Sequence, residues 1–418
     1  MARTNSEWLP VYCNPEALLP KIPETRALFS QRPMLAQDVI GKVISYLRSD
    51  EIKKTGFEYD FRRVVPCRWK CSDESLFGVD LAIYAHTRMY PFDKGTIGGG
   101  FNSSSLDAAV AHGSINVDVG GSHVGYEPDE EGGSFGRIWR PATQQFSTDC
   151  GHLMAMLDPF RQVYRDACAS ILVNQPAGSR PLISVPNEYV QPTWSSERIK
   201  LLVTINELTD EEVEYNPNQP HTATMMGRSL FYLHPTFLDS LPPETARALC
   251  TPKPVPIGRN LRHRYFNIWD SQAKLSNGLP SDRLLMYMKF ILSARHSPAP
   301  LKAAVVNAAL QHNRLTDAVR MGNYRDYDFV SVSGVFIDQY DHQTRAYINL
   351  FQPMAMTIKP RGTAREREFT PEQIHDIFRR MPLAKPVIPL EQIFPYERPQ
   401  HVIESFTFEP GKFTHSEP

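Results

Sequence analysis

"SINVDVGGSHVG", residues 114–125, is the stretch that decides the fold. It is a short apolar run, and such runs are typical of strands buried inside a sheet. Similar runs occur nearby, and we predict strands in each of them: "RRVVPCRW" (62–69), "GVDLAIYAH" (78–86) and "SFGRIWRP" (134–141). Helical patterns alternate with these runs along the chain, and this alternation predicts an α/β sheet flanked by helices.

The helical patterns lie on both sides of these strands. Residues 24–54 carry apolar side chains at helical spacing, and residues 148–173 show the same periodicity. "RPLISVPNEYV" (180–190) predicts a further strand, and residues 327–360 alternate in two runs around "DQYDHQ", which indicates a β-hairpin. The tail from residue 361 contains "TPEQ", a capping box that predicts a short helix.

The chain changes character from about residue 215 to 325. This region is interrupted by proline and reads as helical, so we expect an insertion there. We expect residues 1–59 to form an N-terminal helical region and residues 361–418 to form a C-terminal extension.

Composition narrows the possible partners. The 418 residues carry a formal net charge of −1, with 41% hydrophobic and 22% charged residues, so no overall field favours nucleic acid or an anionic membrane. No apolar run has the length of a signal peptide or a membrane span, which predicts a cytoplasmic protein. Six cysteines are too few for a disulfide scaffold and fit a reducing compartment.

Three residues of the types that bind metals stand at the ends of predicted strands: Cys71, His123 and Cys150. Two thiolates and one imidazole suit zinc, which keeps a fourth position open for water in catalytic sites. Their separations of 52 and 27 residues do not match a zinc finger, so buried structural cysteines are the alternative. The glycines around His123 and after Cys150 favour a small site, because they let the backbone approach closely.

Asp73 follows Cys71 by two residues and would project on the same side of an extended segment. It would accept a hydrogen bond from zinc-bound water, occupy the fourth zinc position, or simply cap a turn. His112 and His152 are secondary candidates, for which a hydrogen-bonded role in the core is the alternative. The glycine-rich loop "IGGGFNSSS" (97–105) lacks the lysine placement of a phosphate-binding loop, which argues against a nucleotide site.

Taken in order, "CSDE", "GGGFNSSSLDAAVAHG", "GGSHVGYEP" and "DCGHLMA" resemble the limiting-CO2-inducible B/C family, the theta class of carbonic anhydrases. The resemblance implies a fold like that of β-carbonic anhydrases over residues 60–360, with the insertion inside it, and a homodimer. It also implies Zn2+ held by Cys71, His123 and Cys150, with Asp73 as the catalytic carboxylate. The function it implies is reversible hydration of carbon dioxide to bicarbonate by zinc-bound hydroxide.

The sequence departs from this pattern at one point. Enzymes of the β type pair the aspartate with an arginine a few residues later, but here the residues after Asp73 are Glu74, Ser75, Leu76 and Phe77. Either Asp73 binds the zinc itself or another cation, such as Arg88, replaces the arginine. Two alternatives therefore stay open: a zinc hydrolase or lyase acting on another small substrate, and a catalytically silent dimer stabilised by zinc.

Overall fold

The computed structural model describes residues 18–408 apart from 97, 103, 129–132, 191–198, 214–226, 271–279, 295–296, 323, 364–365, 395–398 and 407. Contacts divide the chain into two compact units. The first comprises residues 1–155, 279–284 and 296–417, and the second residues 156–278 and 285–295. Each unit is described by itself.

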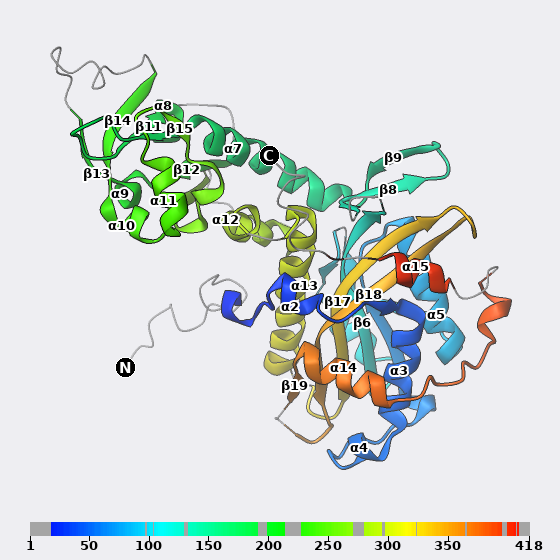
Figure 1. Cartoon of the computed structure of the whole chain (residues 1–418). Coiled ribbons are helices and arrows are strands. Elements are labelled where there is room, and N and C mark those ends of the chain that lie inside the picture. The colour runs from blue at the N-terminus through cyan, green and yellow to red at the C-terminus, as the bar shows by residue number, and fades with distance from the viewer. Residues whose placement is uncertain are drawn as a thin grey trace, which may run out of the picture. The chain divides into compact units, whose positions relative to one another are not determined.

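The first unit is built on a mixed sheet whose main strands follow the order β1-β18-β17-β6-β2-β3, with β1 at Met34–Leu35 and β3 at Phe92–Asp93. Figure 1 labels β18, β17 and β6 of this sheet. Its three central strands, β2 (Val64–Trp69), β6 (Ile115–Glu127) and β17 (Asp328–Asp341), run parallel to one another. The strands β17 and β18 (Ala346–Lys359) form an antiparallel hairpin, which confirms the hairpin predicted for residues 327–360. The predicted α/β class is confirmed by this mixed sheet and the helices that flank it.

The central strands are buried along almost their whole length, because helices pack on the sheet. The helix α13 (Ala299–Met321) packs on β6 and β17, and α6 (Ser104–Val110) packs on β2 and β6. The helices α3 (Ala36–Arg48), α5 (Phe77–Thr87) and α14 (Pro371–Arg380) all contact β18. Thr370 and Gln373 form the capping box that begins α14, as predicted from "TPEQ".

The remaining elements of the first unit are short. They are α2 (Thr25–Leu28), β1 (Met34–Leu35), α4 (Asp50–Lys53), β3 (Phe92–Asp93), β4 (Gly95–Thr96), β5 (Gly100–Phe101), β7 (Ser134–Phe135), β8 (Arg137–Arg140), β9 (Gln145–Thr148), β19 (Arg367–Phe369), α15 (Gln400–Ser405) and the 3-10 helices η3 (Leu19–Lys21), η4 (Phe61–Arg63), η5 (Glu74–Leu76) and η10 (Leu390–Gln392). A hairpin of β8 and β9 precedes the start of α7 (Gly151–Ser170).

Two sequence-based predictions of secondary structure are corrected here. The stretch 78–86, predicted as a strand, lies in the helix α5. Its apolar residues are buried on most sides of the helix, so the sequence lacks the polar face that marks a surface helix. The stretch 24–54 forms α2, α3 and α4 rather than one continuous helix.

The second unit contains a five-stranded sheet in the order β13-β14-β11-β10-β15. Its elements are β10 (Leu172–Asn174), β11 (Leu182–Pro186), α8 (Asn187–Val190), β12 (Ile199–Val203), α9 (Ile205–Leu208), β13 (Thr209–Glu212), β14 (Arg228–Leu233), α10 (Pro235–Asp239), α11 (Pro243–Leu249), β15 (Val255–Pro256), η7 (Gly258–Asn260), η8 (His263–Tyr265), β16 (Phe266–Asp270) and α12 (Met288–Leu292), with most of α7. The short 3-10 helix η9 (Pro280–Tyr287) is divided between the units.

The division into two units does not test the predicted domain limits. The helix α13 belongs to the first unit, although the predicted insertion at about 215–325 includes it. The limits at 1–59, 60–360 and 361–418 stay predictions. Cys13 and the stretch 215–226 lie outside the described residues. Within the described part of the chain, no helix is both long enough and apolar enough to cross a membrane.

Candidate metal centre

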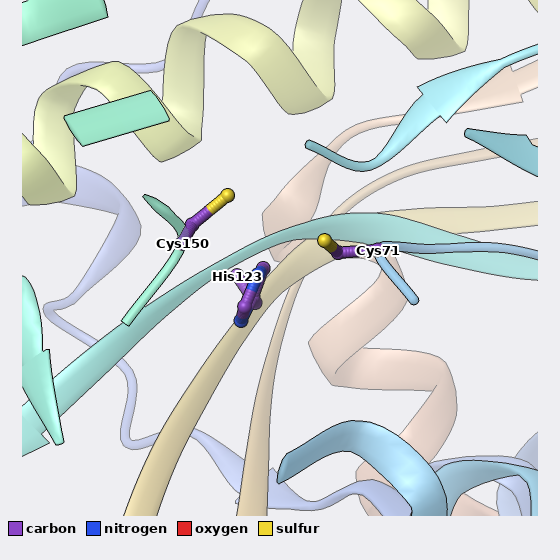
Figure 2. Close-up of side chains that lie close together, drawn as sticks. All are labelled: Cys71, His123 and Cys150. Carbon is purple, nitrogen blue, oxygen red and sulfur yellow. The ribbon is translucent and has the colours of Figure 1, made fainter. Parts of the chain in front are cut away.

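Cys71, His123 and Cys150 come together in the first unit (Figure 2). One ligand atom from each lies within 4.8 Å of the others, and the three residues are at most 8% exposed. Cys71 lies two residues beyond the end of β2, and Cys150 lies between β9 and α7. Because β2 pairs with β6 up to Trp69 and Gly120, the chain leaving β2 continues beside the part of β6 that carries His123.

The sequence predicts His123 at the end of a strand. The structure instead places it inside β6. The glycines before it make room for neighbouring protein atoms. A Cβ on Gly120 would lie 2.3 Å from the Trp69 ring, and one on Gly121 would lie 2.0 Å from the carbonyl oxygen of Gly334 in β17. These glycines therefore allow close packing of the sheet and do not serve as clearance for a metal.

The His123 ring is held from one side by carboxylates. Its Nδ1 lies 2.9 Å from Oδ2 of Asp338 and 3.2 Å from Oδ2 of Asp149. Its Nε2 is buried and has no hydrogen-bond partner among the described residues. Burial lowers the pKa of His123, but the charges of Asp149 and Cys150 outweigh it and hold that pKa well above the usual value. The Nε2 atom is thus the nitrogen left to bind a cation.

The pKa values of the two thiols depend on each other and on His123. Hydrogen bonding from Cys150 lowers the pKa of Cys71 to about 3, against the effect of burial and with help from His123 and from the Gly98 amide, which donates at 3.3 Å. The hydrogen bond to Cys71, together with burial, raises the pKa of Cys150. These shifts favour a thiolate at Cys71 next to a protonated imidazole at His123. A metal ion would replace the protons of such a cluster, so these residues could hold one.

Arg140, on β8, pairs with Asp73. Its Nη1 donates to Oδ1 of Asp73 at 2.9 Å and its Nη2 donates to Oδ2 at 3.0 Å. The Ser75 amide also donates to Oδ1, so Asp73 caps η5 as well. Burial raises the pKa of Asp73, but the hydrogen bonds from Arg140 and Ser75 outweigh it and hold that pKa at about 2.

This pairing answers the question raised by the absent arginine. Arg140 lies 67 residues after Asp73, so no local pattern in the sequence indicated it. Arg88, the cation suggested from the sequence, ends α5 in the left-handed conformation with a φ of 55° and is exposed. Arg140 also pairs with Glu74 and donates to the carbonyl oxygen of Asp149, which links the turn after Cys71 to the residue before Cys150.

The secondary candidates lie outside the cluster. The exposed His112 packs against Phe92 in a tilted arrangement, with ring centroids 5.6 Å apart. His152, at the start of α7, lies against Gly98. A Cβ on Gly98 would be 2.7 Å from the His152 ring. Neither histidine belongs to the metal-capable groups found among the described residues. Cys67 is buried in the sheet, where its thiol contacts Asn116.

The glycine-rich loop forms one wall of the site. Besides the Gly98 amide that donates to Cys71, the carbonyl oxygen of Gly98 accepts a hydrogen bond of 3.0 Å from Asn307 of α13. Gln311, one turn later, accepts from the Phe101 amide at 2.9 Å and donates to Asn307 at 3.1 Å. The sequence did not indicate these two amides, since they lie in the region expected to be an insertion.

Comparisons with known proteins establish no family. No family model matches the chain, and no curated protein gives a significant match. Among solved structures, the chain is similar to PtLCIB4, a homolog of the limiting CO2-inducible protein LCIB, at 13% identity and a TM-score of 0.43, covering 82% of this chain and 97% of that one. It is also similar to LCIB itself, at 12% identity and a TM-score of 0.39, covering 83% and 97%. Both TM-scores and identities are too low to establish common ancestry or function.

Proposed function

We propose that this chain is a zinc-dependent lyase of the carbonic anhydrase kind, which hydrates carbon dioxide reversibly. The observation that carries the proposal is the pairing of Asp73 with Arg140 at the turn that follows Cys71, next to the cluster of Cys71, His123 and Cys150. The four short motifs that resemble the limiting-CO2-inducible B/C family support the same activity.

The donor set fits zinc. Two sulfur atoms and one imidazole nitrogen are ligands that zinc takes in catalytic sites, and Nε2 of His123 is a buried donor with no protein partner among the described residues. When bound, zinc would lower the pKa of a water molecule to about 7 and so supply a nucleophile near neutral pH.

The protein's own residues would then control orientation and access. Arg140 occupies both carboxylate oxygens of Asp73 and so keeps this side chain from acting as a fourth ligand. Asp73 in turn would orient the attacking oxygen through a hydrogen bond. Cys71, His123 and Cys150 are nearly excluded from solvent, which favours a small electrophile such as carbon dioxide.

Stopped-flow measurement of carbon dioxide hydration tests the proposal on purified full-length protein of known zinc content. We expect hydration with one zinc per chain, and loss of both in Cys150→Ala. The buried Cys168→Ala is the matched control, since this cysteine lies in α7 outside the cluster. Zinc without hydration would leave a zinc enzyme for another small substrate or a silent zinc-stabilised dimer, and protein that takes up no metal would refute all three.

A further inference from the structure

Asp338 lies at the centre of a hydrogen-bond network beside the candidate metal centre. This carboxylate is fully buried on β17. Its Oδ2 lies 2.9 Å from Nδ1 of His123 and accepts a hydrogen bond of 3.0 Å from the Ser75 hydroxyl. Its Oδ1 accepts a hydrogen bond of 2.8 Å from Asn349 on the neighbouring strand β18. Three partners therefore fix its orientation.

Asp149, the other carboxylate near His123, is held differently. Neither of its oxygens has a hydrogen-bond partner within the described part of the chain, although Oδ2 lies 3.2 Å from Nδ1 of His123. A hydrogen-bond acceptor whose position is fixed by other hydrogen bonds orients an imidazole better than a nearby carboxylate whose position is not fixed in this way. Of the two carboxylates, Asp338 is therefore the one whose geometry is fixed for orienting the His123 ring.

The same carboxylate is connected to the turn that carries Asp73. Ser75 donates its hydroxyl to Asp338, and its carbonyl oxygen accepts a hydrogen bond of 2.8 Å from Asn349. The Ser75 amide donates to Asp73 at 3.0 Å. Asp338 and Asn349, which are neighbours in the sheet, thus both form hydrogen bonds with Ser75 in the middle of η5. Ser75 in turn forms a hydrogen bond with Asp73.

We propose that Asp338 is a positioning residue that fixes both the metal-binding nitrogen of His123 and the turn bearing Asp73. This inference rests on the proposed function in one respect, because it takes the cluster of Cys71, His123 and Cys150 as a zinc site. Asp338 would keep the proton on Nδ1, so that Nε2 is free for the metal, and would fix the position of the turn that bears Asp73.

The test compares Asp338→Asn with Asp341→Asn in the full chain. Asp341 is a matched control, because it is a carboxylate at the end of the same strand that accepts hydrogen bonds from Thr344 and makes none to the cluster. Competition with a chromophoric chelator gives zinc affinity, which we expect to fall about 10–100-fold in Asp338→Asn and to stay unchanged in Asp341→Asn. The visible absorption of the cobalt-loaded protein should shift in Asp338→Asn alone.

Ser75→Ala tests the second half of the inference. It removes the hydroxyl that joins Asp338 to η5 but leaves the contact of Asp338 with His123. Because Asp338 loses one of the three partners that fix its orientation, we expect a zinc affinity between those of the wild type and Asp338→Asn, with a lower kcat/KM for hydration. If Asp338→Asn does not fold, this variant and Asn349→Ala, which removes another partner of Asp338 and should weaken zinc binding, carry the test.

Zinc affinity and a cobalt spectrum equal to those of the wild type in Asp338→Asn would overturn the inference. Equal loss of stability in the metal-free and zinc-loaded forms, at unchanged affinity, would do so as well, because it would show a merely structural role. Wild-type protein that binds zinc without hydrating carbon dioxide would remove the proposed function but not this inference. Wild-type protein that takes up no metal would overturn both.

Discussion

Replacing Arg140 by alanine should release Asp73. The pKa of Asp73 is held at about 2, below its ordinary value of 3.8, and its side chain is only 12% exposed. A difference of this size corresponds to about 2 kcal/mol in favour of the charged, paired carboxylate, or on the order of 30-fold at 25 °C. Part of this difference comes from the Ser75 hydrogen bonds, so we expect Arg140→Ala to lower kcat/KM for carbon dioxide hydration by at most on the order of 30-fold, since the freed carboxylate could then reach the metal.

The assay is stopped-flow hydration with zinc content measured on the same samples. Glu74→Gln is the control, because it removes only the exposed ion pair of Arg140 and should keep wild-type hydration. If Arg140 acts through Asp73, the losses in Arg140→Ala and Asp73→Asn will not add in the double variant. Additive losses, or full hydration in Arg140→Ala at normal zinc content, would refute the reasoning.

Three further outcomes are expected. Gly121→Ala should destabilise the fold by about 1–3 kcal/mol or more in denaturant unfolding, because the new Cβ would lie 2.0 Å from the Gly334 carbonyl oxygen, whereas Gly151→Ala meets nothing within 4 Å and should not destabilise it. Burial lowers the pKa of His312 from 6.5 to about 4, so the unfolded chain binds the proton more readily than the folded chain. As the pH falls from 6.5 to 4, this residue alone should therefore lower the free energy of unfolding by about 3 kcal/mol. His312→Gln should flatten this part of the stability profile, and an unchanged slope would contradict the assignment. Light scattering should give twice the chain mass of 47.5 kDa, and the mass of a single chain would contradict the homodimer that the resemblance implies.

The sequence predicts the elements whose pattern is local. The hairpin of β17 and β18 alternates clearly, and the capping box at Thr370 needs only four neighbouring residues. The helix α5 could not be predicted in this way, because it is buried on most sides between α3 and β18, and a buried helix resembles a buried strand in its composition.

In the candidate site, too, residues in local motifs could be predicted and residues with distant partners could not. The three residues of the cluster stand in short motifs that could be recognised one by one. Arg140 and Asp338 could not be predicted, because their partners lie 67 and 215 residues away and neither stands in a distinctive local pattern. Long-range pairings of this kind depend on the register of the sheet, which composition and spacing do not determine.

The position of β17 in the middle of the sheet also affects how the chain is made. β6 is complete once residue 127 has been synthesised, but its parallel neighbour begins only at Asp328, and Asp338 follows His123 by 215 residues. At about 5–20 residues per second, the ribosome takes roughly 10–40 s to cover that interval. During this time one edge of an apolar strand has no partner and His123 has no Asp338 beside it. The contact between His123 and Asp338 in the candidate metal centre can therefore form only late in translation.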